Sequence, residues 1–585
     1  MFNKYYQDEL SFLREMGREF SRANPEAAPF LAERGTDPDV ERLLEGFAFL
    51  TGRIRQKLDD ELPEFTHALM QMLWPHYLRP IPSMAILQFD PPPGQLKETG
   101  RIPRGTQINS APVDGTPCRF QTVYDVAVHP MSQEGVELKM EAPPHIRLKF
   151  RLSEGVSLKK SPIPEIRLYL QGDPVVARAL YLCLLHNLKR VVIRPSEGGL
   201  AGKTLVLGPE SVRAAGFQQE EALLPTPPTS FEGFRLLLEY FAFPTKFLFV
   251  DLAGLERLAE LGEFKAFEVT FELARLPEAM PPLGTAGILT NCTPIVNLFK
   301  HDADPIRLDL QRTEYKIRPS GSDGSHYEIY SVNRVLGVIK GAPKPKEYLP
   351  FLGFSHSLSS SGEDASYYKT RTVDAVGAEG TDNYITFVGG EPAGVVPETE
   401  TITMELTCTN RQLPQRLKLG EINVATGSSP VWAKFRNITK ATASVPPPLG
   451  GDVYWRLLSH LSLNYLSLNR VEALRSIVGL YNFRAMVDRQ AEQANKVLQA
   501  GIKRVTSRPA VRLFRGDPVR GVAVELELEE DQFAGEGDMF LFSTMLNEFF
   551  SLYVTLNSFS QLTVKGLKYG EVYTWPPRIG GRITL

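Results

Sequence analysis

The sequence is poor in cysteine, and this excludes one common class of protein. Its 585 residues include only four cysteines, which stand far apart in the chain. They are Cys118, Cys183, Cys292 and Cys408. A secreted domain stabilised by disulfides carries a denser and more regularly spaced set. We therefore expect four reduced, mostly buried thiols and a cytoplasmic protein.

The sequence also lacks an excess of charge of either sign. It has 65 lysines and arginines against 68 aspartates and glutamates, for a net charge of −3. Proteins that bind nucleic acid or anionic membranes usually carry a basic excess. Basic and aromatic residues are not interleaved in the manner of a base-stacking surface. We expect no nucleic-acid partner.

Long hydrophobic runs are missing as well. The first residues, "MFNKYYQDEL", do not show the charged and then apolar pattern of a signal peptide. The best candidate for a membrane span is "FRLLLEYFAFPTKFLFVDLAGL" (234–255). It falls short of about 20 apolar residues, because it is broken by Arg235, Glu239, Pro244, Lys246 and Asp251. This stretch predicts a buried helix followed by a buried strand.

Motifs that carry catalysis or bind metals are absent or incomplete. The chain has no H-x-x-x-H, H-E-x-x-H or C-x-x-C spacing for a metal. The stretch "RVVIRPSEGGLAGKTLVLG" resembles a phosphate-binding loop around Lys203, but Glu197 occupies the position of the required first glycine. A strand-like "LVLG" follows where the motif needs the start of a helix. We interpret this stretch as a hairpin turn.

Two further stretches are weaker candidates for a catalytic or metal site, and each departs from the pattern that such a site requires. "GFSHS" (353–357) has Ser357 in place of the last glycine of a nucleophile elbow. His301 stands close to Asp302 and Asp304, which is more typical of a solvated turn than of a metal site. We therefore expect no catalytic residue, no cofactor and no metal, and a structural or interaction protein is favoured. A cytoplasmic enzyme that handles nucleotides or carbohydrates stays the alternative.

Hydrophobic periodicity divides the chain into four regions. The composition, 43% hydrophobic and 23% charged, is typical of a globular protein. Helical spacing dominates residues 1–83, and period-two strands with helical insertions follow over 84–280. Residues 281–445 are strand-rich with long loops, and 446–585 mix helices and strands. The predicted fold class is α+β and multidomain, with a helical N-terminal region, a β-rich middle and an α/β C-terminal region.

One predicted helix carries more apolar surface than a single buried face requires. Asp37 is placed to cap it and Pro38 to occupy its first position. Its apolar residues recur at spacings of three and four, as in a heptad seam: Val40, Leu43, Phe47, Leu50 and Ile54. Phe49 adds apolar surface outside that seam. Either the flanking helices cover this surface, or another chain covers part of it.

Several long stretches together resemble one protein family. "DPDVERLLEGFAFLTGRIRQKLDDELPEFTHALMQMLWPHYLRPIPS" (37–83) is similar to the N-terminal signature of the TssF family, also called VasA or ImpG. Further blocks follow in the family's order: "IPRGTQINS", "EYFAFPTKFLFVDL", "NCTPIVNLF", "GDVYWRLLSHLSLNYLSL" and "WPPRIGGRITL". The resemblance spans nearly the whole chain.

The resemblance implies a structural role in the baseplate of the bacterial type VI secretion system. Members of the family are non-enzymatic wedge subunits that assemble with TssG, TssK and TssE around the VgrG spike. The assembled platform is where the sheath and tube begin to polymerise, and membrane contact is indirect, through the membrane complex. The family is also similar to wedge proteins of contractile phage tails, and a phage tail wedge protein is a further alternative.

The resemblance also suggests what covers the apolar helix. In a wedge, the seam would pack against a second copy of the chain or against TssG. The predicted interface residues are Val40, Leu43, Phe47, Phe49, Leu50 and Ile54.

Overall fold

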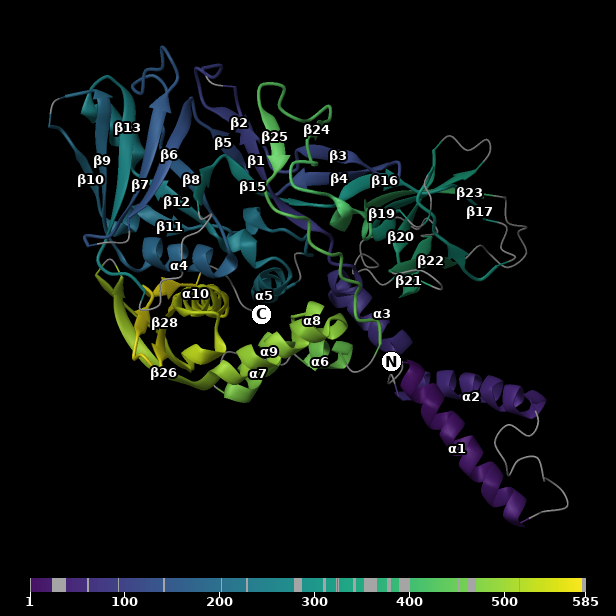
Figure 1. Cartoon of the computed structure of the whole chain (residues 1–585). Helices are drawn as coiled ribbons and strands as arrows, with labels where there is room; N and C mark the ends of the chain where they lie inside the picture. Colours follow the sequence, from purple (N-terminus) through teal and green to yellow (C-terminus); the bar gives the residue numbers. More distant parts are fainter. Residues whose placement is uncertain are drawn as a thin grey trace. The chain divides into compact units, whose positions relative to one another are not determined.

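The computed structural model describes most of the chain (Figure 1). The described residues are 2–23, 38–59, 63–92, 94–139, 142–200, 202–227, 230–277, 287–308, 312–321, 324, 326–339, 344–351, 366–375, 380–388, 400–450, 453–459, 470–514 and 516–580. They form two compact units. The first comprises Met1–Leu78 and Pro448–Leu461, and the second Arg79–Pro447 and Ser462–Leu585. Among the described helices, none combines the length and apolarity needed to cross a membrane.

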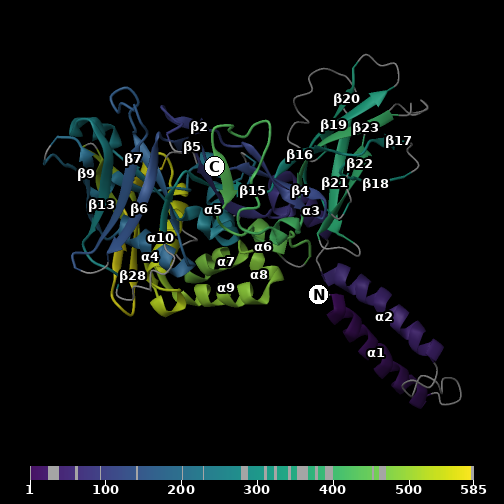
Figure 2. The same cartoon turned by 45° about the horizontal axis from the view of Figure 1, so that its top comes forward.

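The described elements of the first unit are helices. Its helices are α1 (Phe2–Ala23), α2 (Pro38–Asp59), α3 (Pro63–Leu73) and α6 (Val453–Ser459). α1 and α2 lie side by side as an antiparallel hairpin in both views (Figures 1 and 2). α3 contacts α6, where the rings of Phe65 and Trp455 are 6.0 Å apart. The Tyr454 hydroxyl of α6 donates to the Tyr77 carbonyl at 3.3 Å.

A six-stranded sheet forms one core of the second unit. Its order is β24-β3-β4-β15-β1-β25. The strands are β1 (Met84–Asp90), β3 (Gln107–Val113), β4 (Thr116–Thr122), β15 (Cys292–Val296), β24 (Val424–Ala425) and β25 (Lys434–Asn437). Leu87, Phe120 and Ile295 are among its buried residues. The sheet takes strands from both sides of residue 280, so sheets and sequence regions do not coincide.

Two further sheets show the predicted alternation of buried and exposed residues. One has the order β10-β9-β13-β7-β6 and the other β11-β12-β8-β14. Their strands are β6 (Met131–Lys139), β7 (His145–Leu152), β8 (Glu165–Gln171), β9 (Leu188–Gly198), β10 (Leu205–Leu207), β11 (Val212–Ala214), β12 (Phe249–Ala253), β13 (Phe264–Leu273) and β14 (Gly287–Thr290). Buried Phe150 of β7 pairs with buried Phe267 of β13. A small pair, β2 (Gly100–Ile102) and β5 (Val126–Val128), completes this region.

An eight-stranded sheet forms a further core of the second unit. Its main path is β16-β23-β19-β20-β21-β22-β18, and β17 also pairs with β23. The strands are β16 (Phe299–Asp302), β17 (Ile306–Leu308), β18 (Tyr315–Lys316), β19 (Glu328–Ile339), β20 (Lys346–Pro350), β21 (Tyr367–Asp374), β22 (Thr381–Val388) and β23 (Glu400–Thr409). A bridge between Ala303 and Pro319 joins the two ends of this path.

The last part of the second unit mixes helices and strands. Its elements are α7 (Val471–Leu480), α8 (Arg484–Val487), α9 (Arg489–Gly501), β26 (Ile502–Phe514), β27 (Asp517–Leu528), α10 (Glu536–Leu552), β28 (Ser558–Gly566), β29 (Val572–Thr574) and β30 (Arg578–Ile579). β27 and β28 are parallel, and α10 makes the connection between them. Residues 460–469 lie outside the described residues.

α10 also packs against two earlier helices, α4 (Pro174–Leu185) and α5 (Glu232–Ala242). Asp173 caps α4 by accepting from the Val175 amide at 3.0 Å, and Pro174 takes its first position. α5 followed by β12 confirms the buried helix and strand predicted over 234–255.

Candidate functional site

Two of the stretches considered from the sequence, around Lys203 and His301, make structural contacts among the described residues. The stretch around Lys203 is the hairpin of β9 and β10, as predicted. Glu197 binds both terminal nitrogens of Arg151 at 2.6 and 2.9 Å. His301 does not lie in the predicted solvated turn. It belongs to β16, and its Nε2 donates to the Ser320 carbonyl at 2.8 Å. The strand places it there because Phe299–Asp302 pairs with β23.

The cysteine thiols, a second class of reactive group, are buried in the folded chain. All four cysteines are free and buried, as predicted. Burial raises the pKa of the Cys118 thiol to about 11, which keeps it protonated at neutral pH. Within the part of the chain that the structure describes, no three His, Cys, Asp or Glu side chains gather to hold a metal. The "GFSHS" stretch lies outside the described residues.

A polar hollow of about 300 Å³ lies beside Tyr124. Its Arg167 is bound by Asp251 at 2.7 and 2.8 Å and by Glu221 at 2.7 Å. Its His129 donates from Nε2 to the Glu165 carbonyl at 2.9 Å and accepts at Nδ1 from a threonine hydroxyl. Burial lowers the pKa of His129. These contacts hold Arg167 and His129 in place within the folded chain.

The most unusual surface lies on the helical hairpin of the first unit. α2 packs on α1 through two small residues one turn apart, Ala48 and Gly52. A Cβ placed on Gly52 would lie 3.2–3.3 Å from backbone atoms of Tyr5 and Tyr6. The two helices therefore approach at backbone distance, and the large apolar residues of α2 point elsewhere.

Those large residues are exposed. The exposed fractions are 74% for Leu43, 56% for Phe47, 61% for Leu50, 60% for Ile54 and 47% for Phe49. Val40 belongs to α2, but its side chain lies outside the described part of the structure. The expectation that flanking helices cover this surface is wrong for the described residues, because the small residues, not the heptad seam, face α1.

α1 exposes a matching stripe that the sequence analysis did not single out. Phe12, Met16 and Phe20 recur every four residues, and about half of each side chain is exposed. At 100° per residue, this stripe and the Phe47 and Ile54 positions of α2 are rotated in the same direction from the line of helix contact, and Leu50, midway between Ala48 and Gly52, points away from α1. In an antiparallel pair, such stripes lie on the same side. We call these seven residues, Phe12, Met16, Phe20, Leu43, Phe47, Leu50 and Ile54, the apolar hairpin face. Phe49 lies on the opposite side.

A second notable feature is a cluster of charges inside the second unit. Glu239 of α5 accepts from Arg235 Nη1 at 3.0 Å and from the Lys246 ammonium. Its other oxygen accepts from the Leu223 and Leu224 amides at 2.8 and 3.2 Å. All three charged side chains are buried. We call Arg235, Glu239 and Lys246 the buried triad.

The environment shifts both titratable members of the buried triad. Burial raises the pKa of Glu239, but the charges of Lys246 and Arg235 outweigh that effect and hold the pKa below its usual value. Burial lowers the pKa of Lys246 to about 8, although Glu239 acts in the opposite direction. The buried triad fixes α5, the segment before it and the segment after it at one point.

Comparison with known proteins identifies the family to which this chain belongs. A family model described as "Type VI secretion system, TssF" matches residues 1–582. The chain belongs to the TssF family. Among curated proteins, it is 30% identical to type VI secretion system component TssF1 of Pseudomonas aeruginosa, and the match covers 100% of this chain and 99% of the relative.

Two solved structures are similar to this TssF chain. One is a chain of the cryo-electron microscopy structure of the TssK-TssF-TssG baseplate subcomplex, with a TM-score of 0.74 and 31% identity. The match covers 93% of this chain and 99% of that one. The other belongs to the type VI secretion baseplate complex, with a TM-score of 0.67, 26% identity and full coverage of both chains. The chain is a TssF-type baseplate component, as the sequence resemblance implied.

Proposed function

We propose that this TssF chain is a structural wedge subunit that binds TssG and TssK, and that the apolar hairpin face is one of its interfaces. The single observation that carries this proposal is the exposure of seven large apolar side chains on the two helices of one hairpin. Apolar patches of this kind mark interaction sites in soluble proteins. The similar solved structure of a TssK-TssF-TssG subcomplex supports the choice of partners.

We extend the proposal to the rest of the assembly. In the wedge, the apolar hairpin face packs against helices of TssG or of a second copy of this chain, and Phe49 contacts a partner on the other side. TssE and the VgrG spike complete the platform on which the sheath and tube assemble, as in the wedges of contractile phage tails. The free, buried cysteines support a cytoplasmic location. The structural role requires no catalysis.

The test is co-expression with TssG and TssK, followed by size-exclusion chromatography with light scattering. The variant Leu50→Asp/Ile54→Asp places two charges on the apolar hairpin face. Losing two buried aliphatic side chains removes about 3–6 kcal/mol of binding free energy, so the joint peak should disappear at micromolar concentration. Because both side chains are exposed in the chain alone, the variant should keep the wild-type circular dichroism spectrum.

Two further variants complete the design. Glu45→Arg changes a charge at an exposed position of α2 away from the apolar hairpin face, and it should leave the complex intact. Phe49→Asp tests the opposite side: loss of the complex would mean that partners contact both sides of α2. A folded Leu50→Asp/Ile54→Asp variant that still forms the wild-type complex would refute the role of the apolar hairpin face.

A further inference from the structure

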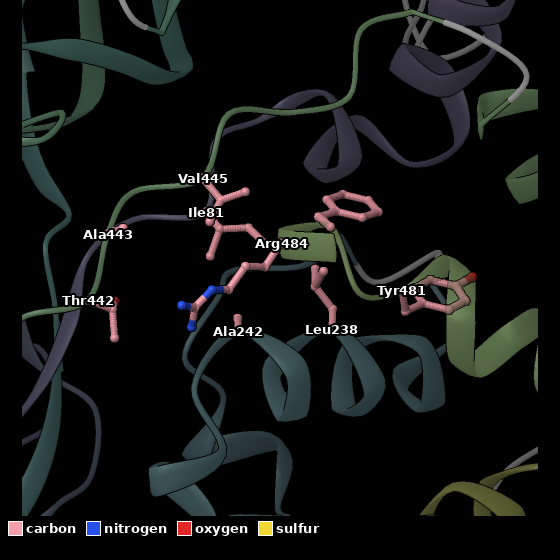
Figure 3. Close-up of a pocket in the computed structure, with 9 residues that line it drawn as sticks. Ile81, Leu238, Ala242, Thr442, Ala443, Val445, Tyr481 and Arg484 are labelled. Carbon is pink, nitrogen blue, oxygen red and sulfur yellow. The ribbon is translucent and has the colours of Figure 1, made fainter. Parts of the chain in front are cut away.

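A small pocket in the second unit is shaped to receive a side chain. It is formed where α5, the segment 442–445 and the start of α8 meet, and its volume is about 140 Å³ (Figure 3). Its lining residues are Ile81, Leu238, Ala242, Thr442, Ala443, Val445, Tyr481, Phe483 and Arg484. We call it the α5–α8 socket. The larger apolar residues are buried, whereas Ala443 and Arg484 at its rim are exposed.

The walls of the α5–α8 socket are fixed before any partner arrives. Ile81 and Val445 exchange two backbone hydrogen bonds, at 2.8 and 2.9 Å. The Thr442 amide donates to the Met84 carbonyl at 2.9 Å, and its hydroxyl accepts from the Met84 amide at 3.0 Å. A preformed pocket binds more tightly than one that must be ordered on binding.

The size of the socket limits what it can hold. An apolar cavity of about 150 Å³ accepts a molecule as large as benzene. The α5–α8 socket, at about 140 Å³, therefore has room for one side chain of the size of leucine or phenylalanine. Its floor of Ile81, Leu238 and Phe483 is apolar, so burial of such a side chain there is favourable.

Arg484 supplies the charge at the rim. Its side chain extends along the mouth of the socket, between Ala242 and Thr442 (Figure 3). Its guanidinium is 3.7 Å from the Asp488 carboxylate, beyond hydrogen-bond distance. Asp488 itself caps α9 by accepting from the Gln490 amide at 2.9 Å. Arg484 is the one charged side chain that lines the socket, and its side chain is 58% exposed.

We propose that the α5–α8 socket binds a segment of a baseplate partner that carries a leucine- or phenylalanine-sized side chain and, one or two residues away, an aspartate or glutamate. The apolar side chain fills the socket, and the carboxylate pairs with Arg484. Guanidinium and carboxylate form parallel hydrogen bonds of matching geometry. The choice of partner rests on the proposed function, because TssG and TssK supply the candidate segments.

The test uses the full chain co-expressed with TssG and TssK. The photo-crosslinker p-benzoylphenylalanine replaces Ala443, which lies at the exposed rim. Mass spectrometry of the cross-linked product should identify a partner residue that is apolar, or adjacent to an apolar residue, within two positions of an aspartate or glutamate. Cross-linking confined to this chain, or to a partner segment without that chemistry, would overturn the inference.

Two substitutions separate the apolar and charged contributions. Ala242→Trp fills the socket and should raise the dissociation rate of the partner roughly tenfold. Arg484→Glu reverses the charge at the exposed rim and should lower the association rate roughly tenfold, with a weaker dependence on salt. Arg436→Glu, an exposed arginine on β25 outside the socket, is the matched control and should bind as wild type.

The outcomes distinguish this inference from the proposed function. If the wild-type chain forms no complex with TssG and TssK, the proposed function fails. If the complex forms and Arg484→Glu binds at the wild-type rate, the α5–α8 socket is not a docking site, although the proposed function stands. Arg484 is exposed, so its variant stays informative even if Ala242→Trp disturbs the fold.

Discussion

At the scale of single residues, the buried triad places two cations against one carboxylate. Arg235, Glu239 and Lys246 together carry a charge of +1 when all three are ionised, and all are buried. The desolvation of such charges is costly unless each is paired. Glu239 offsets that cost for both cations and also accepts from two backbone amides. It is therefore the residue on which the local structure depends most.

Replacement of Glu239 by glutamine should be strongly destabilising. The variant Glu239→Gln leaves Arg235 and Lys246 buried without the carboxylate that binds both, and loss of one partner of a buried ion pair typically costs about 3–5 kcal/mol. Urea unfolding followed by tyrosine and tryptophan fluorescence measures the loss. Glu220→Gln, at an exposed position, should change the free energy of unfolding by less than about 0.5 kcal/mol. Equal stability of the two variants would contradict the role assigned to Glu239.

The lowered pKa of Lys246 predicts that the stability of the folded chain depends on pH. Burial lowers its pKa to about 8 in the folded chain, whereas an unperturbed lysine has a pKa of about 10.4. Between these values the unfolded chain binds a proton that the folded chain has released, so the free energy of unfolding rises with pH in this window. Lys246→Met lacks this contribution. The stability of wild type relative to Lys246→Met should therefore increase between about pH 8 and pH 10, as measured by urea unfolding. A flat difference would contradict the lowered pKa.

At the scale of elements, the hairpin of α1 and α2 shows what the sequence could predict and what it could not. The spacing of Leu43, Phe47, Leu50 and Ile54 predicted a helix with an apolar stripe, and both are confirmed. The side that packs on α1 was not predicted, because Ala48 and Gly52 contribute little to a hydrophobic pattern. The stripe of Phe12, Met16 and Phe20 on α1 was detectable from its spacing of four and was missed.

Some strands could also be predicted from the sequence, whereas others could not. Long alternating strands such as β7 and β13 were predicted because their side chains are buried on one face only. Two-residue strands such as β18 and β24 have no periodicity to detect. The α5–α8 socket also leaves no local motif, because its lining comes from segments that are far apart in the chain.

Gly52 provides a prediction for the hairpin. Gly52→Leu would force apart two helices whose backbones meet at that residue, and overpacking of this kind costs about 1–3 kcal/mol. Gly46→Leu is the matched control, because a Cβ on Gly46 meets nothing within 4 Å and leucine favours a helix by up to about 1 kcal/mol over glycine. Hydrogen exchange in α1 and α2 should become faster in Gly52→Leu and not in Gly46→Leu. Faster exchange in both variants would show that α2 does not pack through Gly52.

At the scale of the whole molecule, the first unit is assembled from distant parts of the sequence. α6 contacts α3 through Phe65 and Trp455, and its Tyr454 hydroxyl donates to the Tyr77 carbonyl in the turn that follows α3. Periodicity assigned α6 to the region 446–585, since its own seven residues say nothing about a partner almost 400 positions earlier. Long-range pairings of this kind follow from packing in three dimensions and cannot be read from local patterns.

The division into two units predicts that a local defect stays local. The buried triad lies in the second unit and Gly52 in the first, and contiguous cooperative parts of a protein open separately. Glu239→Gln should therefore accelerate hydrogen exchange in α5, β12 and α10, and leave α1 and α2 at wild-type rates. Gly52→Leu should do the reverse. Mass spectrometry of peptides from both units, at one pH and temperature, measures each effect. Faster exchange in both units of either variant would show that the chain unfolds as one cooperative body.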